Sequence, residues 1–412
     1  MFCPKTPFCP KTPFCPVAPF CPALPYKVLS KMTNLLSVIP AAICWIFMIT
    51  ADSAWWLYVA RLSGGLSMGM AFACFPLYLG EISDPKTRGG LITVGMIGAP
   101  IGNALVSLIG TVFSVVQSSI AFLVGCVFLL LFFTWLPESP HHLAKKCDAR
   151  KARDSLAWYH RGCDVDAEYA TLEKFVASSG DLTFRESLDE FRRPEIRRAT
   201  FVILALFVFM QMSGLNNIIF YMATILTHAG VTVIDPSMCA TIIMSFGIVA
   251  AIVSVDLMDR LGRRALLISS SVIFSLSLTA LEVHFSLIEA GFQPLQWLPI
   301  TALIFSEIAM FLGLSPVPST VLSELFPPSI KCIASCGASV TSAIVAFICT
   351  KTYQPLLDVM GERYVYWIYV AIVLLAIPFA IFVMPETKGK SLQQIQADIM
   401  SSKSFDSSTN PR

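Results

Sequence analysis

The sequence predicts an all-α membrane protein that crosses a lipid bilayer many times. Hydrophobic residues make up 55% of the 412 residues and charged residues only 14%, whereas soluble domains usually carry about 25% charged residues. The mean hydropathy is +0.70. Apolar stretches of roughly 20 residues, the length that a helix needs to cross the hydrocarbon core, recur along most of the chain. The net charge of +2 gives no sign of nucleic-acid binding.

The chain begins with a Pro/Cys-rich repeat tail, which we assign to residues 1–30. Residues 2–25 are four copies of a hexapeptide, FCPKTP twice and then FCPVAP and FCPALP. Proline at about every third position excludes a helix, so this stretch cannot span a bilayer. It also lacks the charged-then-apolar order of a signal peptide. Its regularly spaced cysteines could bind metal or carry palmitoyl groups; the alternative is a low-complexity tail with neither role.

We expect ten membrane-spanning helices, divided by a long polar loop into four within residues 31–136 and six within residues 199–384. Glycine and proline occur inside several of these spans, as membrane helices tolerate, and small residues let neighbouring helices approach closely. The expected spans lie at roughly 33–50, 55–80, 90–111, 116–136, 199–228, 238–258, 265–286, 297–322, 333–355 and 364–384.

Basic residues predict the orientation. The segment 137–198 holds twelve Lys or Arg, and further basic residues follow the second, sixth and eighth spans, whereas the opposite loops are nearly free of them. Because basic loops favour the cytoplasmic side, both termini are expected to be cytoplasmic. Segment 137–198 is then a cytoplasmic loop, expected to contain short helices (a solvated linker is the alternative), and residues 385–412 form a cytoplasmic tail.

Five charged stretches share one pattern, with an acid, small residues and a base at a helix end. They are Arg61 to Arg88, Pro137 to Leu143, Asp259 to Arg264, Ser323 to Lys331 and Pro385 to Leu392. Together with QMSGLNNIIFY at 211–221 and FICTKTYQPLLDVMG at 347–361, they resemble the sugar porter branch of the major facilitator superfamily, which includes the trehalose transporters of insects. The resemblance covers about residues 31–397 and implies the major facilitator fold.

The resemblance implies that charged groups at the cytoplasmic helix ends form a network that closes that face. Separable pairs expected from the sequence are Glu81 with Arg88, Asp259 with Arg263 and Arg264, and Glu324 with Lys331; the alternative is that these charges serve only as orientation signals. We expect Arg263→Ala to shift the protein toward its inward-open state. The full expected set is Arg61, Glu81, Arg88, Glu138, Asp259, Arg260, Arg263, Arg264, Glu324, Lys331 and Glu386.

A substrate site is expected where amide side chains interrupt an apolar span. Gln211, Asn216 and Asn217 lie in the span 199–228, and an amide both donates to and accepts from a sugar hydroxyl. Gln211 and Asn216 match the glutamine and asparagine that contact sugar in the family; packing between helices is the alternative role. Pro316 and Pro318 match helix-breaking prolines of the family, implying a bend that gates the outer side. Glu282 and Glu307, inside the seventh and eighth spans, could couple protons or pair with neighbours.

The chain also departs from the family pattern. The family has twelve helices, and the first two are missing here, so the first group is incomplete. Met96, Ser319, Ser342 and Ala343 stand where the family has other site residues, and Lys331 and Lys390 replace arginines, which removes the planar bidentate fork. One hypothesis is that the sequence is a truncated, mispredicted or decayed copy of a sugar-porter gene.

The sequence therefore predicts facilitated diffusion of a hexose or a disaccharide such as trehalose by alternating access, in a multi-pass protein of the plasma membrane. The resemblance implies no cofactor, and no nucleotide-binding loop or catalytic constellation indicates an enzyme. The expected partners are the sugar and the lipid bilayer. Two alternatives stay open, a sugar sensor that does not transport and a proton-coupled sugar symporter.

Overall fold

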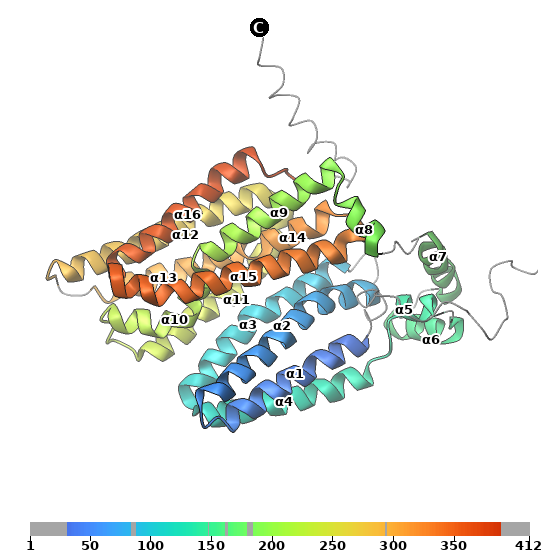
Figure 1. Cartoon of the computed structure of the whole chain (residues 1–412), viewed down its shortest axis with the longest axis horizontal. Coiled ribbons are helices and arrows are strands. Elements are labelled where there is room, and N and C mark those ends of the chain that lie inside the picture. Colours follow the sequence, from blue (N-terminus) through green and yellow to red (C-terminus); the bar gives the residue numbers. More distant parts are fainter. Residues whose placement is uncertain are drawn as a thin grey trace, which may run out of the picture.

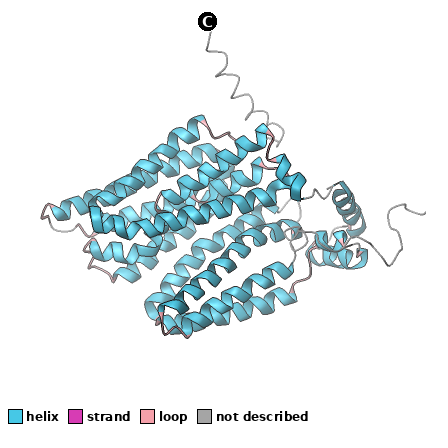
Figure 2. Ribbon diagram, in the orientation of Figure 1, coloured by secondary structure: helices cyan, strands magenta, loops and turns pink. Residues whose placement is uncertain are grey.

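The computed structural model describes residues 31–83, 88–146, 148–160, 164–178, 184–292 and 295–388. Every regular element within these ranges is a helix (Figure 2), which confirms the predicted all-α fold. The repeat tail at residues 1–30 and the chain from residue 389 on, including Lys390, lie outside the described ranges, as do the side chains of Glu81, Arg88, Met96 and Asp259.

The first helix group contains α1 (Lys31–Ile49), α2 (Ala54–Ile82), α3 (Arg88–Val112) and α4 (Val115–Trp135). The helix α1 packs between α2 and α4 (Figure 1). Ser67 donates to the carbonyl of Ser37 at 2.6 Å, which joins α2 to α1. A reciprocal pair of hydrogen bonds between Ser114 and Gln117 caps the start of α4, satisfying donors that a helix end leaves unpaired.

Four short helices follow, namely α5 (Pro140–Lys145), α6 (Ala149–Tyr159), α7 (Val165–Ser178) and α8 (Phe184–Glu190). The first three pack around a small core of Ala152, Leu156, Tyr169 and Leu172 and lie beside the ends of α2 and α4 (Figure 1). The helix α8 instead packs against α15 (Pro328–Met360) of the second group. We refer to this end of the bundle as the α5–α8 end.

The second helix group occupies six positions and holds the largest apolar core of the described chain. Two of its positions are broken, since a turn separates α9 from α10 and a π-helical turn, η1, interrupts the path from α13 to α14. Its elements besides α15 are α9 (Pro194–Met212), α10 (Leu215–His228), α11 (Pro236–Leu261), α12 (Arg263–Glu289), α13 (Trp297–Ala309), η1 (Met310–Leu314), α14 (Pro316–Leu325) and α16 (Glu362–Phe382).

Seven helical segments of the described chain are long and apolar enough to cross a membrane: α4, the α9–α10 segment, α11, α12, the α13–α14 segment, α15 and α16. The helices α1 and α3 contain shorter apolar stretches, Asn34–Ile49 and Ile97–Val112, and α2 covers the remaining expected span. Large apolar side chains such as Phe128, at 66% exposure, and Leu131, at 65%, face outward from α4. Soluble proteins rarely expose such continuous apolar surface, and a multi-pass membrane protein requires it.

The two groups meet where α3 packs on α11, and α2 also contacts α15. Ser107 and Thr241 share a hydrogen bond of 2.8 Å across the first contact. Ser107 lies roughly 30 Å along α3 from the start of that helix, so this bond joins the groups at the end opposite the α5–α8 end.

Candidate functional site

The broken segment α9–α10 sets the geometry of the candidate site. Gly214, between the two helices, has φ of +80°, a conformation that residues with a side chain rarely adopt. A Cβ at this position would lie 2.6 Å from Cδ2 of Tyr369, so the ring of Tyr369 on α16 fills the space beside the break. The break therefore needs glycine for two reasons, and it presents the amides of α9 and α10 around a non-helical turn.

Gln211 and Asn216 lie on opposite sides of this turn and bond to each other. The Nδ2 of Asn216 donates to Oε1 of Gln211 at 2.6 Å, and Nε2 of Gln211 donates to Oγ of Ser342 on α15 at 2.6 Å. Gln211 is 8% exposed. This chain of neutral donors and acceptors satisfies the buried amide, and its members can exchange these bonds for bonds to a hydroxylated ligand.

Asn217, the third predicted site residue, faces a different neighbour. Its Nδ2 donates to the hydroxyl of Tyr369 at 2.8 Å and lies 3.4 Å from the carbonyl oxygen of Cys349. The side chain is 1% exposed, and its Oδ1 accepts no hydrogen bond from the described residues. These contacts fit the packing alternative better than the binding one, since they fasten α10 to α15 and α16.

Aromatic side chains extend the site along α10, α15 and α16. The rings of Tyr221 and Tyr353 lie 4.9 Å apart between centroids, and the hydroxyls of Tyr353 and Tyr366 share a bond of 3.2 Å. Such rings offer apolar faces with polar edges.

The predicted gate prolines lie directly after η1. Pro316 begins α14, and Pro318 follows within its first turn. The N–H of Ser315 donates to the carbonyl of Met310 at 3.0 Å, the wider spacing that defines the π-helical turn. The two prolines and η1 together form a local departure from α-helical hydrogen bonding, which is the feature that a bend requires.

Glu307 lies one turn before η1, on α13, and is 1% exposed. Its Oε1 accepts no hydrogen bond from the described residues. A Cβ added at Gly247 of α11 would lie 3.0 Å from that oxygen, so the carboxyl group points at the backbone of α11. Glu282 on α12 is fully buried.

At the α5–α8 end, Arg263 pairs with a partner that the sequence did not indicate. Its Nη2 lies 2.9 Å from Oε1 of Glu324, so the ion pair joins α12 to α14 inside the second group. Glu386 accepts the backbone N–H groups of Arg263 and Arg264 at 3.2 and 3.1 Å. Lys388 donates to the carbonyl of Arg260 at 2.5 Å.

Three further members of the predicted network have side-chain contacts or positions that differ from those of this cluster. Arg260 pairs with Asp256 on its own helix at 2.9 Å. Glu138 accepts the backbone N–H of Lys31 at 2.9 Å, within the first group. Arg61 corrects the sequence expectation, because it lies near the start of α2, roughly 30 Å from Ile82 at the α5–α8 end, and is exposed. Arg61 therefore cannot contribute to a network at that end in this conformation.

Comparison with known proteins identifies the family. Residues 23–399 match the family described as sugar (and other) transporters. The chain belongs to this family. The facilitated trehalose transporter Tret1 of Bombyx mori is 30% identical over 379 residues, covering 90% of this chain and 74% of the relative. Tret1 of Aedes aegypti is also 30% identical, over 90% of this chain but 46% of the relative. The chain thus spans about half the length of the first curated relatives that it matches.

Solved structures of the xylose transporter XylE from E. coli share the fold. The inward-open form is 17% identical with a TM-score of 0.73, covering 89% of this chain and 82% of the other. The form bound to 6-bromo-6-deoxy-D-glucose, a proton:xylose symporter of the major facilitator superfamily, has a TM-score of 0.71 at 17% identity and the same coverage. The predicted sugar-porter resemblance and major facilitator fold are confirmed.

Sequence reasoning named Ser342 only as a departure from the family pattern, yet Ser342 is the hydrogen-bond partner of Gln211. It did not single out Tyr369, Cys349 or Tyr353, because an aromatic residue in an apolar span gives no signal of its own. The spacing of Tyr366 and Tyr369 along one face of α16 is the pattern that could have indicated them.

Proposed function

We propose that this protein is a membrane carrier that moves a small sugar by facilitated diffusion through alternating access. The observation that carries the proposal is the amide pair Gln211 and Asn216 at the break in an otherwise apolar helical segment. Polar groups at membrane depth are costly and mark substrate pathways, and broken helices at mid-membrane form the substrate sites of secondary transporters. The proposed substrate is a hexose or a disaccharide such as trehalose.

The chemistry of the cluster suits a neutral polyol. Each amide offers both a donor and an acceptor, and the cluster carries no charge that would select an ion. When the site is empty, Gln211 is satisfied by Asn216 and Ser342; when sugar binds, its hydroxyls take over these bonds. The exchange keeps the desolvation cost of the buried amides low in both states.

Transport would follow from rocking of the two helix groups around this site. The Ser107–Thr241 contact joins the groups at one end, and the charged residues of the α5–α8 end would close the other in the opposite state. In the proposed topology the α5–α8 end and both termini are cytoplasmic and the membrane is the plasma membrane. The charge distribution supports that orientation.

The test is uptake of labelled trehalose and of labelled glucose by cells expressing the chain, with surface protein quantified in parallel. We expect saturable uptake that Gln211→Ala reduces at least tenfold without lowering surface protein. Gln354→Ala, which changes an exposed glutamine of α15, serves as the matched control. Binding of sugar without flux, at normal surface levels, would overturn transport in favour of a sensor.

Glu307 supports a second candidate function, proton-coupled transport of the same sugar. A buried carboxylate with an oxygen that lacks a hydrogen bond is costly, and uptake of a proton would remove that cost. Its place beside η1 and Gly247 would link its charge to the packing of α13 against α11. Uptake that collapses when a protonophore removes the pH gradient, and that Glu307→Gln makes independent of the gradient, would select this candidate over facilitated diffusion.

A further inference from the structure

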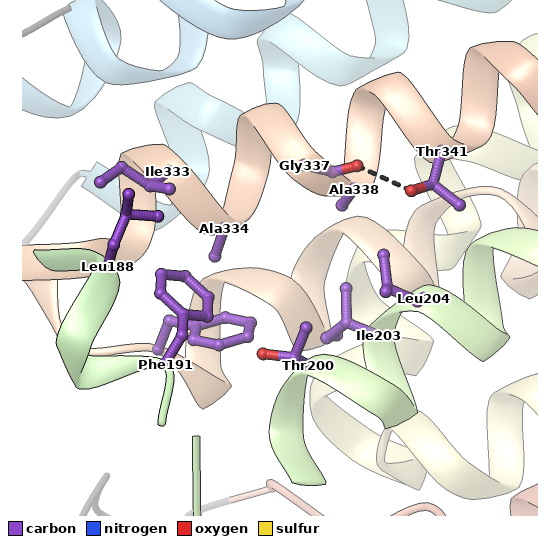
Figure 3. A pocket seen from close by; sticks show the side chains of 11 residues that line it. Leu188, Phe191, Thr200, Ile203, Leu204, Ile333, Ala334, Gly337, Ala338 and Thr341 are labelled. Atoms are coloured by element: carbon purple, nitrogen blue, oxygen red, sulfur yellow. Dashed lines mark hydrogen bonds between the residues drawn. The ribbon is translucent and has the colours of Figure 1, made fainter. Parts of the chain in front are cut away.

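The short helices of the α5–α8 end are attached to the two helix groups by different chemistry. Figure 3 shows Leu188 of α8 and Phe191 beside Ile333 and Ala334 of α15, in the apolar wall of a cavity between α8, α9 and α15. Such hydrocarbon contacts do not depend on pH. The helices α5–α7 make polar contacts instead, with hydroxyl groups of α6 bonded to the chain just before α5.

His160, the residue that caps the end of α6, lies between α7 and the end of α2. Its Nδ1 lies 2.6 Å from Oε1 of Glu168 on α7, and its Nε2 lies 3.1 Å from the carbonyl oxygen of Ile82, the last residue of α2. The side chain of His160 is 12% exposed and that of Glu168 is 27% exposed, so water has little access to either contact. One imidazole ring thus connects three helices.

Both nitrogens of this ring face an oxygen atom. The carbonyl oxygen of Ile82 can only accept, so the proton of that contact belongs to Nε2 of His160. The contact between Nδ1 and Oε1 of Glu168 needs a second proton, whichever of the two atoms carries it. The docked pair therefore holds two protons. Above about pH 6.5 a histidine in water is neutral and a glutamate is ionised, so the same two side chains hold one proton when they are apart.

The end of α2 is a favourable place for the additional proton. The last carbonyl groups of a helix have no partner within the helix, and they carry the negative end of its dipole, which attracts a protonated histidine. The carboxyl group of Glu168 lies at the other nitrogen of the ring. Both neighbours of His160 thus attract positive charge.

Other ionisable groups of α2, α6 and α7 are paired with one another. Arg153 of α6 lies 3.0 Å from Asp166 of α7, and the hydroxyls of Tyr78 and Tyr159 share a hydrogen bond of 2.8 Å. Burial raises the pKa of Tyr159 above its ordinary value. These pairs therefore keep the same charge throughout the neutral range of pH.

Further titratable groups of the described chain around this contact are Glu138, His141, His142 and Asp164. Of these residue types only histidine ordinarily changes its charge between about pH 5 and 8, so an experiment must separate the two histidines of α5 from His160. The side chain of Glu81 and residue Arg161 lie outside the described residues.

We propose that His160 and Glu168 form a proton-dependent clamp that docks α6 and α7 onto the end of α2. Because the docked pair binds one proton more than the separated pair, docking weakens as pH rises through the neutral range. In the topology proposed above, the clamp responds to the pH of the cytoplasm. It depends neither on the identity of the sugar nor on transport itself.

The test is hydrogen exchange of the purified full-length chain in nanodiscs, measured by mass spectrometry between about pH 5.5 and 8, where histidine changes its charge. Protection is the exchange rate of an unstructured reference peptide divided by that of the protein at the same pH, so the intrinsic pH dependence of exchange cancels. Peptides of α6 and α7 report docking, and peptides of α8 serve as an internal reference.

Glu168→Gln is the decisive variant, because its amide can donate to an unprotonated Nδ1, and both contacts then persist with a neutral ring. Glu173→Gln, at an exposed glutamate of the same helix, is its control. His160→Ala removes the clamp, and His228→Ala, at an exposed histidine of α10, is the control for that change.

We expect the protection of wild-type α6 and α7 to fall as pH rises, by at most about tenfold per pH unit because one proton is released, while that of α8 stays constant. Glu168→Gln should keep the protection of the acidic state over the whole range, and His160→Ala should show low protection at every pH. Both controls, and the double variant of His141→Gln with His142→Gln, should respond as the wild type does.

Three results would overturn the clamp. The first is wild-type protection of α6 and α7 that does not change with pH. The second is a pH response that persists in Glu168→Gln, because the clamp then has no second proton to release. The third is loss of the response in the double variant of His141 and His142, which would assign the titration to α5.

Discussion

At the scale of single residues, two neighbouring amides, two and three positions after the helix break at Gly214, have different surroundings. Asn216 bonds to Gln211 and is partly accessible, whereas Asn217 is buried against Tyr369 and Cys349. The sequence placed both in the same apolar span and could not separate them, because the partners of Asn217 lie more than a hundred residues away on α15 and α16. This difference in surroundings leads us to propose ligand contact for Asn216 and helix attachment for Asn217.

Removing the partner of Asn217 should therefore affect stability more than transport. Tyr369→Phe removes the 2.8 Å acceptor of Asn217 Nδ2 and leaves it only the longer 3.4 Å contact with the Cys349 carbonyl. Losing a buried hydrogen-bond partner costs up to about 1–3 kcal/mol. We expect a lower melting temperature of the purified protein and an unchanged KM for sugar uptake in the molecules that reach the surface. Tyr364→Phe, at an exposed position of the same helix, is the control; a raised KM with unchanged melting would instead assign Asn217 to the substrate.

Substitution of Ser342 should instead affect sugar transport more than stability. Ser342→Ala removes the acceptor of Gln211 Nε2, and because a net hydrogen bond contributes about 0.5–1.5 kcal/mol, the loss of positioning should raise KM roughly two- to tenfold at normal surface expression. Concentration-dependent uptake measures it. Ser339→Ala, at an exposed position one turn away, should leave KM unchanged, and an equal effect of the two substitutions would contradict a positioning role for Ser342.

At the scale of elements, the spans were predictable and their interruptions were not. Length and hydropathy place a helix wherever about 20 apolar residues occur, and the expected bounds 116–136 and 364–384 differ little from α4 and α16. The expected spans 199–228 and 297–322 are each broken, because the positive φ of Gly214 and the π-helical turn at η1 are set by tertiary packing. The partner of Arg263 was missed for the same reason, since Glu324 approaches it only after α12 and α14 pack together.

The short helices are held to the first group by a cluster of hydroxyls. The hydroxyl of Tyr159 on α6 donates to the carbonyl of Pro137 at 2.9 Å and lies 2.8 Å from the hydroxyl of Tyr78 on α2. Burial, followed by the hydrogen bond with Tyr78, raises the pKa of Tyr159 above its ordinary value. Folding thus favours the protonated phenol, so this contribution is complete below about pH 10, the ordinary tyrosine pKa, and is lost as pH rises further.

We therefore expect alkaline undocking of α5–α7 that depends on Tyr159. Spectrophotometric titrations of the wild type and of Tyr159→Phe should differ by one tyrosine that ionises well above pH 10. Its ionisation should coincide with loss of the near-ultraviolet circular dichroism of Trp158, whose ring centroid lies 4.7 Å from that of Tyr159. Tyr58→Phe, at an exposed position of α2, controls for an ordinary phenol. Ionisation of Tyr159 together with the exposed tyrosines would contradict the buried arrangement.

At the scale of the whole molecule, the Ser107–Thr241 hydrogen bond between the two helix groups lies far from the α5–α8 end. The described ion pairs at that end lie within one group or the other, as Arg263 with Glu324 does, and the Ser107–Thr241 bond crosses between the groups at the opposite end. In the carrier proposed above, this distribution would correspond to a state that is open toward the α5–α8 end. Transport by alternating access then requires α2 and α15 to change their separation during each cycle.

Two native cysteines report on that separation. Cys74 lies on α2 and Cys336 on α15, two helices of different groups that contact each other. A short thiol-reactive cross-linker that joins them should hold the groups together and reduce sugar uptake severalfold, with recovery when a cleavable linker is reduced. Cys74→Ser and Cys336→Ser should each abolish the inhibition, as measured by uptake before and after treatment. Cross-linked protein that transports at the full rate would show that α2 and α15 move as one body, which would contradict rocking of the two groups about the amide site.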